Sequence, residues 1–206
     1  MNDELLNNNK VCLQGYIKTN PEYNHEVMGE KFFSFILEVP RLSGQYDYIP
    51  ITISEKLIND DFKIGEKLAL KGQFRSYNKL DEDKRKLVLS VFVRELCQWD
   101  DQMNANTIEI NGYICKPAIY RTTPFSREIC DVLLAVNRNY NKSDYIPCIA
   151  WGRNAGYVSN MPVGTMLSIV GRIQSRDYNK HIENSQEIVT KTAYEVSISH
   201  VILNED

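Results

Sequence analysis

The strongest constraint on the fold of this chain is that its sequence repeats. When the sequence is shifted by about 97 positions, Asp47-Tyr48-Ile49-Pro50 falls on Asp144-Tyr145-Ile146-Pro147. After a small insertion, Tyr77-Asn78-Lys79 likewise falls on Tyr178-Asn179-Lys180. One such match can arise by chance, but an ordered series of matches that stays in register indicates a duplicated domain.

The repeat divides the 206 residues into two parts of similar size. We expect a first domain over residues 8–98 and a second domain over residues 106–203, with the polar stretch 99–105 as the linker between them. A domain of this size can fold on a single hydrophobic core.

Both halves alternate apolar and polar residues, as Leu68, Leu70 and Phe74 illustrate. This period of two is typical of half-buried β-strands. Only residues 55–62 and 153–160 show a short helical pattern, and each stretch lies between the third and fourth strand runs of its half. Five short strands with one helix at that place are typical of the OB-fold. The sequence therefore predicts an all-β protein of two tandem OB-folds, each a five-stranded Greek-key barrel with one short helix between strands 3 and 4.

Composition excludes several classes of protein. With 43% hydrophobic and 25% charged residues, the chain is neither disordered nor a collagen-like or disulfide-rich scaffold. No apolar run approaches the ~20 residues that cross a bilayer, and the acidic, Asn-rich N-terminus lacks the features of a signal peptide. The five cysteines are odd in number and widely spaced, as expected for small buried residues in a reducing compartment. We therefore expect a cytoplasmic protein.

The net charge of −3 neither indicates nor excludes a nucleic-acid partner. The excess of acidic residues lies at the two ends and in the linker, whereas residues 106–203 hold ten Lys and Arg against eight Asp and Glu. The positions of the basic residues are therefore more informative about the partner than the net charge.

The sequence contains no motif for catalysis, for a metal ion or for another cofactor. Nucleophile-elbow, phosphate-loop and zinc-protease patterns are absent from it. His25, His181 and His200 form no ligand set with the cysteines. We expect a protein that is not an enzyme and that has no cofactor.

What remains is a set of aromatic residues interleaved with basic ones, for example in Trp151-Gly152-Arg153. Proteins that bind single strands without sequence preference stack bases on aromatic rings, worth ~1–3 kcal/mol per base, and guide the phosphates along a basic groove. In the fourth strand of the second half, Ile169, Gly171 and Ile173 are expected to face the core, which leaves Arg172 on the opposite face. Each such residue taken alone is as readily structural, so only the combination favours a nucleic-acid interface.

At these residues the second half resembles the bacterial single-stranded DNA-binding protein family. The similarity runs through residues 112–114, 134–138, 145–152 and 170–176. It implies an OB-fold that stacks bases on aromatic rings at four places. In this chain the four stacking positions fall on Tyr140, Tyr145, Trp151 and Tyr178. The basic residues expected to contact phosphates are Arg138, Arg153, Arg172, Arg176 and Lys180.

The first half is a more distant copy of the same domain. Tyr48 and Tyr77 keep two of the stacking positions, and Arg75 is the candidate basic contact of this half. Ser54 and Gln73 stand where the second half has a tryptophan and an arginine. The resemblance therefore implies weaker nucleic-acid binding by the first half, or an architectural role in which it packs against the second half.

The resemblance also implies an assembly and a role. Family members with one OB-fold per chain form homotetramers, so a chain with two is expected to form a homodimer with four OB-folds. The implied function is non-catalytic binding and protection of single-stranded DNA in replication, recombination or repair. Because the sequence ends at Asn204-Glu205-Asp206, we expect no acidic C-terminal tail that recruits partners. The alternative is an OB-fold module of a replication or primosome-type assembly that binds proteins and little nucleic acid.

Overall fold

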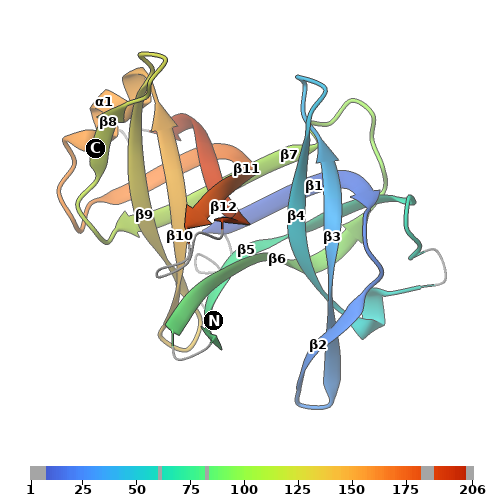
Figure 1. Cartoon of the computed structure of the whole chain (residues 1–206). Helices are drawn as coiled ribbons and strands as arrows, with labels where there is room; N and C mark the ends of the chain where they lie inside the picture. Colours follow the sequence, from blue (N-terminus) through green and yellow to red (C-terminus); the bar gives the residue numbers. More distant parts are fainter. Residues whose placement is uncertain (1–7, 60–61, 82–83, 182–187, 203–206) are drawn as a thin grey trace.

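The computed structural model describes residues 8–59, 62–81, 84–181 and 188–202. Most of these residues lie in β-strands, which confirms the prediction of an all-β protein (Figure 1). The strands of the first half are β1 (Asn9–Ile17), β2 (Glu22–Val27), β3 (Glu30–Pro40), β4 (Tyr46–Ser54), β5 (Lys67–Asp81) and β6 (Lys84–Cys97). Those of the second half are β7 (Asn106–Ile114), β8 (Ile119–Thr122), β9 (Glu128–Arg138), β10 (Lys142–Trp151), β11 (Met166–His181) and β12 (Ile188–Ile202). The side chain of Lys180 and the acidic chain end at residues 203–206 lie outside the described part.

The two halves repeat one pairing scheme. In the first half β1 pairs with β5 and β3, β5 pairs with β6, β6 pairs in parallel with β4, and β4 pairs with β3. This closes a circuit of five strands, and β2 is attached outside it through β3. In the second half β7, β11, β12, β10 and β9 form the same circuit, with β8 attached to β9.

The strands differ from the prediction in number and length. Five strands per half were expected, and the structure adds β2 and β8 as a sixth in each half. The expected strands were short, whereas β5 and β11 extend over 15 and 16 residues. Both strands continue past their own barrel as one arm of a long hairpin with β6 or β12. The apolar-polar alternation does not reveal this extension, because the outer part of each hairpin has little core to face.

The two predicted helices differ in the structure. The second helix, α1, spans Arg153–Ser159 and buries Ala155 and Val158. The first is only a three-residue 3-10 turn, η2, over Glu55–Leu57, so the prediction of a helix at residues 55–62 is wrong in extent. The turn contributes no buried residue to the core. A short helix is stable mainly through the packing of an apolar face, which explains why the second stretch forms a helix and the first does not.

Two equivalent glycines lie where the backbones of neighbouring strands approach closely. Gly72 and Gly171 each follow a β-bulge in the long hairpins. A Cβ atom on Gly72 would lie 2.3 Å from the carbonyl oxygen of Phe92, and one on Gly171 would lie 2.3 Å from that of Ser197. The repeated glycines are therefore explained by close backbone packing at a bulge.

The two halves are joined directly rather than only through the linker. Strand β1 pairs antiparallel with β7, from Asn9 opposite Ile110 to Leu13 opposite Asn106. This pairing makes one continuous twelve-stranded sheet of the described strands. In Figure 1 the halves lie side by side, and the β5–β6 hairpin extends to the lower ends of β9 and β10 of the other half. The relative position of the halves is thus held by backbone hydrogen bonds.

Candidate nucleic-acid interface

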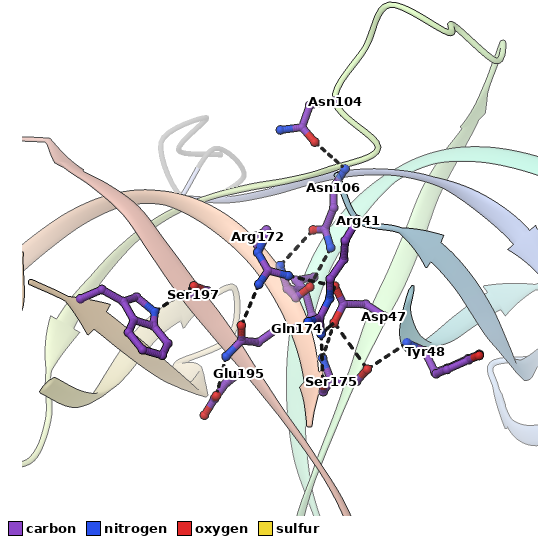
Figure 2. A network of polar contacts seen from close by, with 12 residues as sticks. Arg41, Asp47, Tyr48, Asn104, Asn106, Arg172, Gln174, Ser175, Glu195 and Ser197 are labelled. Carbon is purple, nitrogen blue, oxygen red and sulfur yellow. Dashed lines mark hydrogen bonds and ion pairs between the residues drawn. The ribbon is translucent and has the colours of Figure 1, made fainter. Parts of the chain in front are cut away.

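A buried carboxylate from the first half holds the hairpin of the second half in place. Asp47, at the start of β4, is fully buried and accepts a hydrogen bond from the backbone N–H of Ser175 at 2.8 Å. Its oxygens also accept hydrogen bonds from Arg41 Nε at 2.8 Å and from Arg172 Nη1 at 3.0 Å (Figure 2). The backbone N–H of Tyr48 donates in turn to the hydroxyl of Ser175 at 2.9 Å. We call the contacts around Asp47 and Ser175 the first seam contact.

The repeat builds an equivalent second seam contact around Asp144 and Ser76. Asp144 is fully buried and accepts a hydrogen bond from the backbone N–H of Ser76 at 2.7 Å, and the N–H of Tyr145 donates to the Ser76 hydroxyl at 2.7 Å. Arg138 Nε lies 3.3 Å from Asp144 Oδ2, close enough for an ion pair but without hydrogen-bond geometry. Burial raises the pKa of the Asp144 carboxyl. The two seam contacts share the same backbone hydrogen bonds, whereas the arginines around the two carboxylates differ.

The seams account for two of the predicted phosphate contacts. Arg172 was expected to project freely from the face opposite the core, but its guanidinium bonds to Asp47 and donates to Gln174 Oε1 at 3.1 Å. Burial lowers the pKa of Arg172. Arg138 is likewise directed toward Asp144. Strand periodicity identifies the face on which an arginine lies, but it does not show that a second domain covers that face.

The four predicted stacking residues of the second half all have exposed rings. Tyr140 stands in the β9–β10 turn at a positive φ of 63° and is 93% exposed. Tyr145 and Tyr178 are exposed on β10 and β11, and Trp151 ends β10 with its Nε1 donating to the Ser197 hydroxyl at 3.1 Å. That hydrogen bond connects the indole to the neighbouring strand β12.

Two of the remaining predicted cations are accessible beside these rings. Arg153 is exposed at the first position of α1 and lines the same surface hollow as Trp151 and Tyr157. Arg176 is exposed on β11, 3.7 Å from the carboxylate of Glu195. These two arginines stand closer to the open surface than the seam arginines and are better placed to meet a phosphate.

The structure brings one predicted residue from each half into a common groove. Tyr77 and Tyr178, which match in the repeat, both line a cavity of about 660 Å³ between the halves. Pro50 and Pro147, a second matching pair, and the half-buried Tyr194 line it as well. The long hairpins create this groove because each reaches across to the other half. Tyr48 stands apart from it, with Lys18 Nζ 5.6 Å from the centre of its ring.

The sequence reasoning missed an aromatic residue and a cation of the first half. Phe92 on β6 is half-buried, and the guanidinium carbon of Arg75 lies 4.0 Å from the centre of its ring. Arg94 approaches the same ring at 5.3 Å. Alignment of the halves compares equivalent positions, so it does not detect a ring that has moved to the adjacent strand.

Other chemistry is not indicated by the part of the chain that the structure describes. No three His, Cys, Asp or Glu side chains converge there as a metal site would require. All five cysteines are free, with Cys130 and Cys148 buried and the others half-buried. None of the described helices has the length and apolar character to cross a membrane.

Comparisons with known proteins agree with this geometry. Residues 105–203 match a sequence model of the Single-strand binding protein family. Single-stranded DNA-binding protein 3 of Streptococcus agalactiae serotype V is 35% identical over 88 residues, which cover 39% of this chain and 61% of that protein. Single-stranded DNA-binding protein 1 of Staphylococcus aureus strain COL is 32% identical over 93 residues, or 42% and 55% of the two chains. The chain thus spans about 55–61% of the length of these relatives.

Solved structures match both halves. The wild-type single-stranded DNA binding protein from Thermus aquaticus superposes with a TM-score of 0.70 over 96% of this chain and 93% of that chain, at 18% identity. A deletion mutant of the same protein gives a TM-score of 0.73 over 96% and 95%, at 17% identity. At this level of identity the comparison shows a shared fold. The sequence comparisons thus place the similarity to the single-strand binding protein family in residues 105–203, just under half of the chain.

Proposed function

We propose that this protein binds single-stranded DNA without catalysis and protects it in the cytoplasm during replication, recombination or repair. The observation that carries the proposal is the exposure of all four aromatic rings, Tyr140, Tyr145, Trp151 and Tyr178, on the half that matches the family. Aromatic platforms of this kind stack bases of any sequence, at ~1–3 kcal/mol per base. The family is described as one of binding proteins, which agrees with the prediction that the chain is not an enzyme.

The proposed architecture is two OB-folds in tandem, at residues 8–98 and 106–203, with 99–105 between them. The closed five-strand circuit of each half supports it, because a small closed Greek-key barrel is the core of the OB-fold. The match to the Thermus aquaticus protein over both halves supports it as well.

The proposed path of the strand starts on the second half. Bases stack on Tyr145 and Trp151, and Arg153 meets a phosphate beside the indole. The strand then continues past Arg176, which is exposed on β11, toward the groove that Tyr178 and Tyr77 both line. Arg172 is assigned instead to the first seam contact, since its guanidinium donates to Asp47, whereas Arg138 lies beside Asp144 without a hydrogen bond to it.

The direct test is titration with oligo-dT while tryptophan emission is followed. Trp99 is a second emitter, 5.8 Å from Tyr16 and covered by Lys67 at 4.8 Å, so the experiment uses the Trp99→Phe variant. We expect quenching of Trp151, tight binding, and affinity that falls as salt is raised. Failure to bind at about 50 mM salt would reject the function, because electrostatic attraction is strong under that condition.

We further propose that the protein is a homodimer with four OB-folds. The motivation is the duplication itself, because two copies of this chain provide as many barrels as a tetramer of single-barrel chains. Light scattering coupled to gel filtration tests this, and a monomer at micromolar concentration contradicts it. The alternative of a protein-interaction module is not favoured, because the family match and the four exposed rings point to a nucleic-acid ligand.

A further inference from the structure

The first half has lost the tryptophan of the second half, yet it carries a ring on the neighbouring strand. In the second half Trp151 ends β10 and its indole bonds to Ser197 on β12. In the first half Ser54 ends β4, and the residue on β6 that pairs like Ser197 is Phe92. Gln73 pairs with Phe92, and Arg172, which matches Gln73 in the repeat, pairs with Ser197. The aromatic group has therefore moved from one strand of the parallel pair to the other.

The cation of the long hairpin has moved in the same manner. The second half has Arg172 and Gln174 on β11, and the arginine donates to the amide oxygen of the glutamine at 3.1 Å. At the matching positions of β5 the order is reversed, with Gln73 and Arg75, and Arg75 donates to Gln73 Oε1 at 2.9 Å. The shift of two residues along the strand removes the arginine from the seam carboxylate and places it over Phe92.

These residues surround a pocket that has a basic lining. The pocket has a volume of about 410 Å³, and its described lining contains Arg75, Phe92 and Tyr77 of the first half and Arg138 of the second half, with no acidic residue. His25 also lines the pocket, and its ring stacks on Phe32 with 4.9 Å between the ring centres and an interplanar angle of 10°. The pocket thus combines aromatic surface with two guanidinium groups.

The guanidinium groups retain unused hydrogen-bonding capacity. Nε of Arg75 and Nε of Arg138 are buried and donate to no acceptor among the described residues. Burial, with Arg94 and Arg138 nearby, lowers the pKa of Arg75 to about 10, so it remains positively charged at neutral pH. A buried donor without an acceptor costs ~1–3 kcal/mol, more when it is charged. An anion in the pocket relieves this cost.

We propose that this pocket is a second nucleic-acid site, which holds one nucleotide of an unpaired strand. Arg75 and Arg138 bind the phosphate, and the base lies against Phe92 and the Arg75 guanidinium, a plane on which bases also stack. The site lies on the same face of the hairpin as Tyr77, so it continues the path from the groove onto the first half. The proposal rests on the proposed function and extends it to a set of residues that the repeat alignment does not identify.

The test compares a long and a short oligonucleotide on the full chain. Phe92→Leu removes the ring but keeps an apolar side chain, and Arg75→Gln, the second variant, removes the guanidinium that lies over that ring. For oligo-dT of about 35 nucleotides, long enough for two OB-folds, we expect Phe92→Leu to weaken binding about 5- to 100-fold. For oligo-dT of about 8 nucleotides, which the second half binds alone, we expect less than about a 2-fold change.

The outcomes separate this proposal from the function on which it rests. If wild-type protein binds the long oligonucleotide and both variants bind it equally well, the second site is overturned while the function stands. If wild-type protein binds neither oligonucleotide, the function itself fails. If millimolar inorganic phosphate displaces the long oligonucleotide from wild type and not from Arg75→Gln, the strand competes with phosphate for the pocket, and the proposal is supported. Arg75→Gln is expected to reduce the slope of log K against log salt by about 0.7.

Discussion

Asp47 and Asp144 occupy matching positions in the repeat, yet the cations around them differ. Both are fully buried, and both accept a hydrogen bond from a backbone N–H of the opposite hairpin. Asp47 has hydrogen bonds from two arginines, whereas Arg138 beside Asp144 makes an ion pair without a hydrogen bond. Duplication has kept the backbone contact that positions the halves, and the arginines have diverged around it.

The difference shows that an arginine that hydrogen-bonds to a seam carboxylate has less capacity left to bind a phosphate. In the first seam contact, Arg172 is used by Asp47 and its side chain is 38% exposed. In the second seam contact, Gln73 replaces the equivalent arginine, and Arg75 turns to the ring of Phe92 instead. The first half, which lacks the tryptophan and the arginine that the second half has, therefore has cations with more capacity to bind a phosphate.

The largest expected effect concerns the stability of the two seams. Asp47→Ala leaves two arginines without their carboxylate, and we expect it to lower the free energy of unfolding by about 3 kcal/mol, the lower end for a broken buried pair because both guanidinium groups reach solvent. Asp144→Ala removes one backbone acceptor and a loose ion pair, so about 1–2 kcal/mol is expected. Urea unfolding followed by circular dichroism measures both, and equal losses would contradict the difference between the seams.

The next effect concerns base stacking in the two halves. Trp151→Ala is expected to weaken binding of oligo-dT by ~1–3 kcal/mol, the contribution of one stacked base. Tyr48→Ala is expected to cost less than about 1 kcal/mol, because this ring stands apart from the groove and Lys18 lies over it. Fluorescence anisotropy of a labelled oligonucleotide measures both variants without relying on tryptophan. Equal losses at the two positions would remove the asymmetry.

A smaller effect separates seam arginines from phosphate-binding arginines. Arg172→Gln copies Gln73 of the first half, and we expect it to lower stability while the salt dependence of binding stays unchanged, since Asp47 already neutralises this arginine. Arg153→Gln is expected to leave stability unchanged and to reduce the slope of log K against log salt by about 0.7, the value for one phosphate contact on a single strand. The opposite assignment of slopes would place Arg172 on the DNA.

The smallest effect is a pH dependence of the second seam. Because burial raises the pKa of Asp144, the folded chain binds more protons than the unfolded chain between the ordinary aspartate pKa and the raised value. The contribution of Asp144 to stability therefore increases as the pH falls through that window. Compared with Asp144→Asn, which cannot take up the proton, wild type should gain stability when the pH is lowered from about 7 toward about 4. A relative loss over the same range contradicts the raised pKa.

Much of the fold was predictable because its signals are local. The alternation of apolar residues, the matching glycines and the short helical stretch before Asn160 all report the surroundings of a residue and its near neighbours. The second helix was predicted over residues 153–160, and the structure has α1 over Arg153–Ser159 with Ala155 and Val158 buried. The first helix and the long hairpins were not predicted correctly, since their extent depends on what another part of the chain offers for packing.

The candidate site was likewise predicted from the sequence only in part. Exposure of Trp151 and Tyr178 follows from their positions at a strand end and in a hairpin, and the structure shows both exposed. The roles of Arg172 and Arg138 at the seams could not be derived from the sequence, because Asp47 and Ser175 meet across 128 positions of the chain. Phe92 was not predicted because it lies on β6, beside the strand β4 that the alignment matches with β10.

From sequence alone, this protein is a duplicated all-β chain whose second copy carries the aromatic residues of a single-strand binding family. Periodicity and repeat matches are properties of short segments, so they can be recognised without knowing how the two halves contact each other. Tertiary structure established which arginines bind carboxylates, which cavity Tyr77 and Tyr178 both line, and how the Arg75–Phe92 pocket forms. The reason is that hydrogen bonds and buried charges depend on partners brought together by the β1–β7 pairing and the crossing hairpins, over separations that no local pattern encodes.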